Sequence, residues 1–209
     1  MGASQVLDNL SSLSFLILTG GKSSRFGSDK KDALLNEISL FDRILFDIPI
    51  GCQVIVSGPA PMDQIERVRV IEDDVLNMGP VAGIANSIHA ISTEYVAIVA
   101  TDTPFGIKII DWLLQFVDGT AGVYIPVDQD GFTQSLCAIY ESNSLKSFLS
   151  TLESVENQSM KSLILGLHSK MINVPIEMAR FLTDIDTPEA LYLAQEMFKK
   201  SPEQETLEA

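Results

Sequence analysis

The chain has 209 residues, 46% of them hydrophobic and 20% charged, and this balance predicts a folded protein with a sizeable buried core. A formal net charge of -14 argues against a non-specific nucleic-acid binder, which needs a basic face to displace counterions from phosphates. The sequence shows neither a membrane-length apolar stretch nor a signal peptide, so we expect a cytoplasmic protein that binds neither nucleic acid nor membrane.

Short apolar runs alternate with helix-like stretches along the chain. The apolar runs predict strands over Phe15–Leu18, Gln53–Val56, Val68–Ile71, Tyr95–Ala100, Gly122–Ile125, Leu136–Tyr140 and Met171–Val174. Apolar residues at helical spacing predict helices over Leu40–Phe46, Val81–Ile91, Ile107–Val117 and Pro188–Phe198, the last with Thr187 as its N-cap. This alternation predicts an α/β fold, with a doubly wound, mostly parallel sheet and helices on both faces. We expect one domain over residues 1–209, with its core at about 14–200 and a flexible acidic tail at 201–209.

The strongest local signal follows the first predicted strand, where Leu18 leads into Thr19-Gly20-Gly21. In an open parallel sheet, ligands bind beyond the carboxyl ends of the strands, and glycines there let backbone N–H groups approach phosphate oxygens. Four of the 14 basic residues lie between positions 22 and 31, namely Lys22, Arg25, Lys30 and Lys31. The loop matches neither a Walker P-loop nor a dinucleotide-binding fingerprint. It indicates a phosphate site, with a tight turn carrying solvated charges as the alternative.

The cysteines and histidines indicate no chemistry of their own. Cys52 and Cys137 both lie in apolar runs, which predicts buried free thiols rather than a disulfide. With only His89 and His168 besides them, the chain offers no zinc-type cluster. We expect both histidines to be packed or surface residues.

The loop Leu18–Lys30, LTGGKSSRFGSDK, resembles the L-A-G-G-x-S-x-R-M-G-x-D-K signature of the molybdenum cofactor guanylyltransferase family, within the nucleotidyltransferase superfamily. Further segments resemble the family in the same order, at Ser39–Leu45, Val70–Asp73, Gly79–Gly83, Ala100–Phe105, Gln134–Tyr140 and Asp184–Glu189. The similarity therefore extends from about Phe15 to Leu191. It implies a Rossmann-like nucleotidyltransferase fold.

The resemblance also implies which residues hold a guanine nucleotide. The backbone of Leu18, Thr19, Gly20 and Gly21 would contact the nucleotide, Lys30 and Arg25 its phosphates, and Asp73 its base or sugar, while Gly79, Pro80 and Gly83 would shape the base pocket. Three departures stand out in the sequence. Thr19 replaces the usual alanine and adds a hydroxyl close to the nucleotide, Ser57 stands where the family often has asparagine, and two extra residues after Lys30 leave Lys31 as an alternative phosphate contact.

Asp102 is the candidate metal ligand, because it follows a wholly apolar strand at the edge where sites form. Mg²⁺ prefers oxygen ligands and is often held by one or two carboxylates together with substrate phosphates. The alternative is that Asp102 caps the next helix through the turn at Thr103. The resemblance favours Mg²⁺ at Asp102, with Arg25, Lys30 and Asp102 as the catalytic set. Asp184 and Asp186 stand where the family usually has asparagines, and a second metal ligand there stays open.

The activity that the resemblance implies is transfer of GMP from GTP to the terminal phosphate of molybdenum-bound molybdopterin (Mo-molybdopterin), with release of pyrophosphate. A phosphate monoester has a second pKa of about 6, so the nucleophile is already anionic and needs no Ser–His or Cys–His activation. The reaction still requires that the phosphate charges are neutralised and the reacting groups aligned, and basic groups with Mg²⁺ supply both. Molybdoenzymes or their chaperones would be further partners.

Two other functions compete with this one. The first is a related nucleotidyltransferase that acts on a sugar phosphate or an isoprenoid precursor, or that makes the cytidine form of the cofactor. The second is a non-catalytic nucleotide-binding protein with a decayed site, against which the joint presence of Arg25, Lys30 and Asp102 argues.

Overall fold

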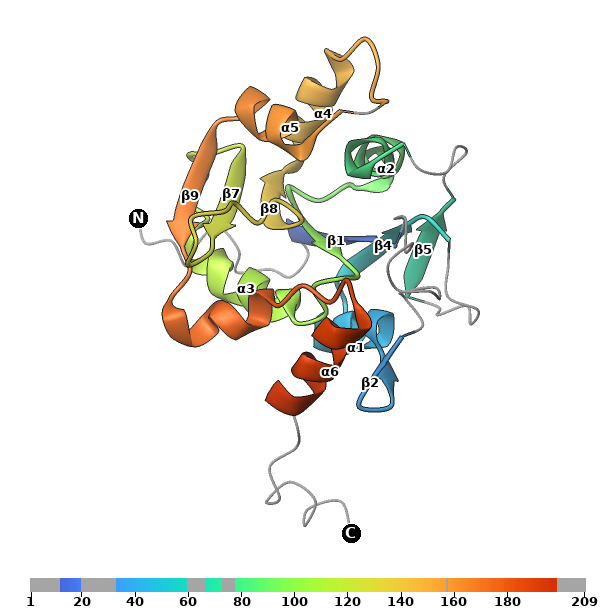
Figure 1. Cartoon of the computed structure of the whole chain (residues 1–209). Helices are drawn as coiled ribbons and strands as arrows, with labels where there is room; N and C mark the ends of the chain where they lie inside the picture. The colour runs from blue at the N-terminus through green and yellow to red at the C-terminus, as the bar shows by residue number, and fades with distance from the viewer. Residues whose placement is uncertain (1–11, 20–32, 60–66, 73–77, 157, 199–209) are drawn as a thin grey trace.

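The computed structural model describes residues 12–19, 33–59, 67–72, 78–156 and 158–198. A seven-stranded sheet with the order β5-β4-β1-β6-β8-β7-β9 runs through this part of the chain (Figure 1). Its strands are β1 (Leu13–Leu18), β4 (Gln53–Ser57), β5 (Val68–Ile71), β6 (Tyr95–Ala100), β7 (Val123–Val127), β8 (Cys137–Glu141) and β9 (Ser169–Asn173). A separate two-stranded hairpin joins β2 (Leu34–Leu35) to β3 (Ile38–Ser39).

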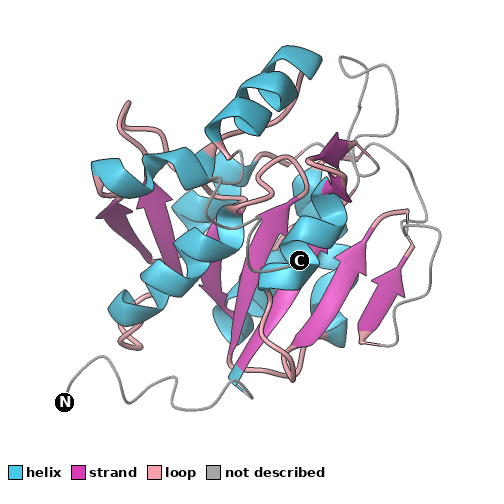
Figure 2. Ribbon diagram, turned by 90° about the horizontal axis from the view of Figure 1, so that it is seen from below, coloured by secondary structure: helices cyan, strands magenta, loops and turns pink. Residues whose placement is uncertain are grey.

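Helices cover both faces of the sheet, as Figures 1 and 2 show. One face carries α2 (Pro80–Ser87), α4 (Ser142–Ser150) and α5 (Met160–Gly166), and the other carries α1 (Leu40–Asp47), α3 (Gly106–Leu113) and α6 (Pro188–Met197). Short 3₁₀ turns at Ile88–Ala90 and Leu114–Phe116 extend α2 and α3, and a longer 3₁₀ segment at Ile176–Leu182 leads towards α6. None of the helices in the described ranges is long and apolar enough to cross a membrane.

The first half of the sheet is wholly parallel. β1 lies at its centre and pairs in parallel with β4 on one side and β6 on the other, and β5 pairs in parallel with β4. Every residue of β1 and β6 is buried, because helices cover both faces at this position. The exception to the parallel arrangement is β8, which runs antiparallel between β6 and β7.

Two apolar layers hold the helices to the sheet. Phe15, Ile17 and Phe41 belong to the layer beneath α1 and α3, while Leu16 and Ile84 belong to the layer beneath α2, α4 and α5. Alternate residues of β1 therefore contribute to opposite layers, as the period of two in a strand requires. This packing fixes the end of β1 from both sides.

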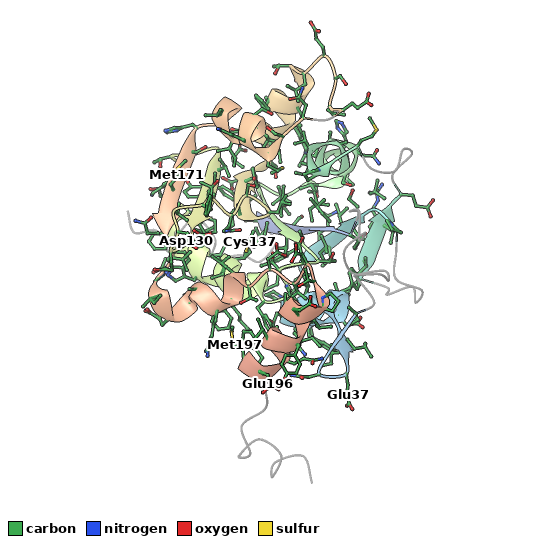
Figure 3. The ribbon with its side chains drawn as sticks, in the orientation of Figure 1. Glu37, Asp130, Cys137, Met171, Glu196 and Met197 are labelled. Carbon is green, nitrogen blue, oxygen red and sulfur yellow. The ribbon has the colours of Figure 1, made fainter. Side chains whose placement is uncertain are left out.

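A third, smaller apolar cluster lies at the end of the molecule where α6 meets the hairpin. It consists of Leu35, Leu40, Phe105, Ile185 and Ala194, which come from five separate segments of the chain. Figure 3 shows Glu37 on the hairpin and Met197 on α6 at this same end.

The sequence predicted most of this architecture. All seven strands of the main sheet are confirmed within two residues at their starts and ends, and so is the doubly wound, mostly parallel arrangement with helices on both faces. The four predicted helices are confirmed, although the two middle ones end as 3₁₀ turns. Thr187 caps α6, since its hydroxyl accepts a hydrogen bond from Ala190 N at 3.1 Å. The sequence did not predict α4, α5 or the hairpin. The predicted acidic tail lies outside the described residues.

Candidate active site

The candidate site lies where β1 and β6 end side by side. The chain extends from β1 through β4 to β5 in one direction, whereas β6 adds to the opposite side of β1. Ligands of open α/β sheets bind at such a switch in strand order, beyond the carboxyl ends of the strands. Thr101 N donates to Leu18 O at 3.2 Å, which aligns the two strand ends. The next residues, Thr19 and Asp102, therefore flank the switch point.

Thr19 joins the ends of β1 and β4. Its backbone N–H donates to Ser57 O at 3.0 Å, and its hydroxyl contacts the carbonyl oxygens of Ser57 and Pro59 at 3.0 and 3.1 Å. Thr19 is buried, so these hydrogen bonds are shielded from water. The Thr19 hydroxyl, which we expect close to the nucleotide, holds the chain that leaves β4 in the structure.

Gly83 allows α2 to pack closely against this strand end. A Cβ atom on Gly83 would lie 2.9 Å from Ser57 Oγ, which is closer than van der Waals contact permits. The Ser57 hydroxyl occupies that space and donates to Gly83 O at 3.1 Å. Gly83 therefore leaves the space that the Ser57 hydroxyl fills, and the two residues pack as a pair. The sequence alone gave no reason to pair these two residues.

Gly79 begins α2 with a backbone conformation that favours glycine. Its φ is +88°, in the left-handed region, and Pro80 follows as the first residue of the helix. Asn86 on α2 donates to Glu72 O at 3.1 Å, just beyond the end of β5. This bond ties the C-terminal end of α2 to the end of β5, and the close contact of Gly83 with Ser57 and Leu18 holds the helix at the strand ends.

Asp102 does not serve as the cap of the following helix. The N-cap of α3 is Phe105, and no side chain caps that helix. Asp102 lies instead in a turn closed by Thr103 N donating to Ala100 O at 3.1 Å. Its half-buried carboxylate lies 3.5 Å from the Thr103 hydroxyl. The structural alternative to a ligand role, helix capping, is therefore wrong for this residue.

The C-terminal part of the chain returns to Asp102. Ile185 N donates to Asp102 O at 2.7 Å, and the fully buried Ile185 side chain packs in the cluster that contains Phe105. This link brings Asp184, which is exposed, and Asp186, which is half-buried, next to the candidate metal ligand. The resemblance to the family includes the segment Asp184–Glu189. A backbone hydrogen bond between residues so far apart, however, cannot be predicted from the sequence.

Some of the expected site residues lie outside the described residues: Gly20, Gly21, Arg25, Lys30, Lys31 and Asp73. Their roles stay predictions, as does the choice between Lys30 and Lys31.

The donor chemistry at the switch point fits Mg²⁺. Within the described residues no three Asp, Glu, His or Cys side chains gather into a metal-binding group. Mg²⁺ does not need such a group, because it often takes one or two carboxylates and completes its shell with substrate phosphates and water. Asp102 would be the protein ligand in that arrangement.

The burial of the cysteines and the exposure of the histidines agree with the predictions from the sequence. Cys52 and Cys137 are buried free thiols, and Figure 3 shows Cys137 in the middle of the molecule. Burial raises the pKa of the Cys137 thiol to about 12, so it stays protonated and unreactive. His89 and His168 are exposed. These four residues provide no nucleophile or base for the candidate site.

Comparison with known proteins agrees with this geometry. Residues 15–170 match the model of the MobA-like NTP transferase domain, which spans β1 to the start of β9. The chain belongs to this family. It is thus a nucleotidyltransferase, related to proteins of molybdenum cofactor biosynthesis.

Relatives in the MobA-like family resemble the chain over most of its length. A probable molybdenum cofactor guanylyltransferase of Thermococcus sibiricus is 28% identical over 183 residues, 82% of this chain and 91% of the relative. A similarly named protein of Halalkalibacterium halodurans is 34% identical over 148 residues, 66% of this chain and 74% of the relative.

Solved structures share the fold. Molybdopterin-guanine dinucleotide biosynthesis protein A from Archaeoglobus fulgidus superposes with a TM-score of 0.70 at 18% identity, covering 90% of this chain and all of that one. The 2-C-methyl-D-erythritol 4-phosphate cytidylyltransferase of Thermus thermophilus superposes with a TM-score of 0.64 at 14% identity, covering 88% and 98%. At these identities the two structures show that the chain shares their fold.

Proposed function

We propose that this MobA-like protein is a molybdenum cofactor guanylyltransferase. It transfers GMP from GTP to the terminal phosphate of Mo-molybdopterin and forms molybdopterin guanine dinucleotide and pyrophosphate. The observation that carries the proposal is the position of Thr19 and Asp102 on either side of the switch point, joined by the Thr101–Leu18 hydrogen bond. The names of the relatives supply the substrates.

The reaction forms one bond and breaks one bond at the α-phosphorus of GTP. An oxygen of the acceptor phosphate forms the new P–O bond, and the P–O bond to the β-phosphate breaks as pyrophosphate leaves with its electron pair. No proton has to be removed from the nucleophile near neutral pH, because a phosphate monoester is already largely ionised. The site therefore needs groups that position phosphates and neutralise their charge.

Different residues of this chain position the phosphates and neutralise their charge. Leu18 and Thr19 would contact the nucleotide at the end of β1, and Asp102 would hold Mg²⁺. When bound, the ion supplies charge neutralisation between the phosphates. Arg25 and Lys30 neutralise further charge on the triphosphate. Gly79 allows the turn that begins α2, and Gly83 keeps α2 close to the strand ends, so that both shape the wall on which the base lies.

A related nucleotidyltransferase reaction is the second candidate, because a cytidylyltransferase shares the fold at a TM-score of 0.64. The experiment that separates the candidates is pyrophosphate release from GTP, CTP, UTP and ATP, each with Mg²⁺, with and without Mo-molybdopterin. We expect release with GTP and Mo-molybdopterin together, and none when Mg²⁺ is removed by a chelator.

Other outcomes of this experiment contradict the proposal. Release with CTP and Mo-molybdopterin would assign the cytidine reaction, and release with a sugar phosphate or an isoprenoid phosphate as acceptor would assign a different transferase. Thermal stabilisation by GTP without release from any acceptor would indicate a non-catalytic nucleotide-binding protein.

A further inference from the structure

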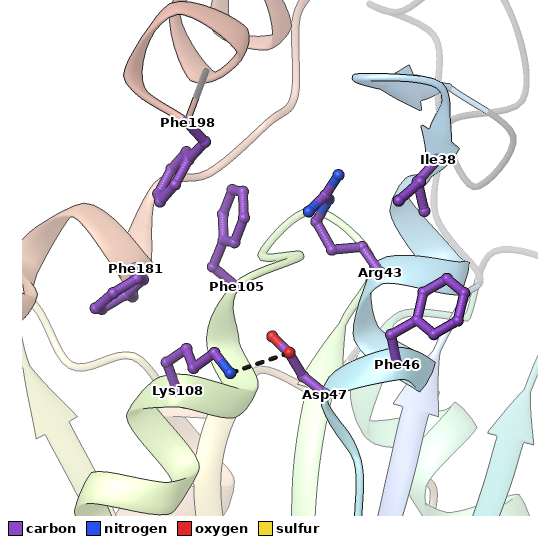
Figure 4. A pocket seen from close by; sticks show the side chains of 8 residues that line it. All are labelled: Ile38, Arg43, Phe46, Asp47, Phe105, Lys108, Phe181 and Phe198. Carbon is purple, nitrogen blue, oxygen red and sulfur yellow. Dashed lines mark hydrogen bonds and ion pairs between the residues drawn. The ribbon is translucent and has the colours of Figure 1, made fainter. Parts of the chain in front are cut away.

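A cavity lies between α1, α3 and the C-terminal segments. Its volume is about 480 Å³, which is within the range of small-molecule sites. Figure 4 shows the side chains that surround it. The lining consists of Ile38, Arg43, Phe46, Asp47, Phe105, Lys108, Phe181 and Phe198. None of these residues has a role in the proposed transfer reaction.

Aromatic rings form one wall of this cavity. Phe105 and Phe198 stack with ring centroids 3.7 Å apart, and Phe181 lies with its centroid 6.1 Å from that of Phe198. Phe46 on the opposite side is 76% exposed, so its ring is available at the rim. Such walls favour a flat apolar body, because aromatic rings gain from offset stacking and edge contacts in addition to burial.

The charges that line the cavity leave one positive charge uncompensated. Lys108 Nζ and Asp47 Oδ1 form an ion pair at 3.0 Å, drawn as a dashed line in Figure 4, and their charges cancel. Asp47 also acts on Arg43, so the two cations of the described lining share one carboxylate. Its guanidinium lies 5.4 Å from the centroid of the Phe105 ring, against the aromatic wall.

Arg43 also has hydrogen-bonding capacity to spare. Nη2 donates to Leu35 O at 2.8 Å, whereas Nε is buried and has no partner within the ranges that the structure describes. Burial lowers the pKa of Arg43 and Asp47 opposes that effect, so the guanidinium stays charged in a partly desolvated position. A partly desolvated guanidinium binds a carboxylate more strongly than one in open water.

We propose that this cavity is a binding site for a small aromatic monocarboxylate, with the flat body against the phenylalanine rings that line it and the carboxylate at Arg43. The excess positive charge of the described lining favours a negative group on the ligand, and the aromatic rings favour a planar body. Phe105 follows Asp102 by three residues, so an occupant contacts the segment that carries the candidate metal ligand.

Binding is tested with three probes that share one naphthalene body: 2-naphthylacetate, 2-naphthylacetamide and 2-(2-naphthyl)ethylamine, with charges of -1, 0 and +1. Saturation-transfer NMR titrations give the dissociation constants on the intact protein. We expect 2-naphthylacetate to bind with a Kd on the order of 1 mM, as its size allows. We expect the amide to bind about tenfold more weakly and the amine not to bind detectably.

Substitutions in the lining test the charge balance in both directions. Arg43→Met removes the cation that would bind the carboxylate and should weaken 2-naphthylacetate about tenfold. Lys108→Gln leaves Asp47 uncompensated and should weaken the probe about threefold, whereas Asp47→Asn should tighten it about threefold. Lys108 is 46% exposed, so that variant should fold even if Arg43→Met does not. Arg69→Met, an exposed arginine on β5, is the control and should change nothing.

Three results would overturn the assignment: no saturable binding of any probe, equal binding of the acid and the amide, or insensitivity of the acid to both Lys108→Gln and Asp47→Asn. Because the titrations require neither nucleotide nor turnover, their outcome is independent of the proposed guanylyltransferase activity.

Discussion

Two aspartates that follow β6 and β7, the strands on either side of β8, have different roles at the same edge of the sheet. Asp128 comes directly after β7, and its carboxylate accepts hydrogen bonds from Asp130 N, Phe132 N and the Gln134 side chain at 3.0, 2.8 and 2.7 Å. Asp102 comes just after β6, and it caps no helix. The first carboxylate stabilises its own loop, while the second is fixed through its backbone.

The difference is whether the side chain or the backbone makes the hydrogen bonds that hold the loop. At Asp128 the side chain makes the local structure, so its oxygens are used within the loop. At Asp102 the local structure is made by backbone hydrogen bonds, from Thr103 N to Ala100 O and from Ile185 N to Asp102 O. The backbone hydrogen bonds of Asp102 thus fix its position in the chain, whatever the side chain binds.

The largest effect should come from exchanging the acids for amides. We expect Asp102→Asn to lower kcat/KM for pyrophosphate release about a thousandfold, because charge stabilisation by a bound cation is worth several kcal/mol. Asp128→Asn should change kcat/KM less than twofold. Steady-state assays of both variants at saturating Mg²⁺ measure this, and near wild-type turnover by Asp102→Asn would contradict the metal role.

Stability should distinguish the parallel half of the sheet from the mixed half. Ile17 lies on β1, in the interior of the sheet, and is fully buried, whereas Ile172 on the edge strand β9 is only partly buried. We expect Ile17→Ala to lower the free energy of unfolding by about 3–4 kcal/mol and Ile172→Ala by about 1–2 kcal/mol. Urea denaturation measures both, and similar losses would show that the two halves are equally packed.

The contact between Ser57 and Gly83 should behave as one unit. We expect Gly83→Ala to displace the Ser57 hydroxyl from Gly83 O, and to weaken GTP binding about tenfold as α2 moves outwards. Adding Ser57→Ala to Gly83→Ala should restore part of the affinity, with a coupling energy of about 1 kcal/mol. GTP titrations of the two single variants and the double variant form the cycle, and additive effects would refute the pairing.

Removal of the Asp128 carboxylate should affect stability at neutral pH and not in acid. Burial raises the pKa of Asp128, but the hydrogen bonds from its loop outweigh burial and hold the pKa below its usual range. The stability that the carboxylate contributes is therefore present above the unfolded pKa of about 3.9 and is lost as the pH falls through the native pKa. Asp128→Ala should cost about 1 kcal/mol at pH 7, since these bonds are partly solvated. Denaturation between pH 3 and pH 7 measures the difference, which should shrink on acidification; a constant difference would exclude the linkage.

The smallest effect concerns the hairpin between β2 and β3. Asn36 and Glu37 both have positive φ, at 51° and 68°, in the turn of this hairpin. We expect Glu37→Gly to raise the free energy of unfolding by about 0.5–1 kcal/mol, because glycine adopts this conformation without steric cost. Asn36→Gly should gain less, since asparagine tolerates the left-handed region. Thermal denaturation measures both.

The elements that could be predicted from the sequence are those in which the pattern of apolar residues matches the pattern of burial. Tyr95–Ala100 is apolar throughout because both faces of β6 are covered. Four serines lie in α4, which obscured the helical pattern, and the Glu141 side chain caps that helix at Asn143 and Ser144. The hairpin was missed because a glutamate occupies a turn position where glycine would have signalled it. In the site, the residues that follow β1 and β6 could be predicted from strand order, whereas the Ser57–Gly83 contact depends on packing between distant segments.

The hydrogen bond from Ile185 to Asp102 has a consequence for synthesis of the protein. Domains begin to fold from the N-terminus while the chain is still being made. The strands β1, β4 and β6 can associate early, but the Asp102 carbonyl has to wait for Ile185, which belongs to the last part of the described chain. Residues 15–170, which match the family, end before that point. A ribosome that stops after residue 170 would thus release a chain with the complete family match and an unfinished site.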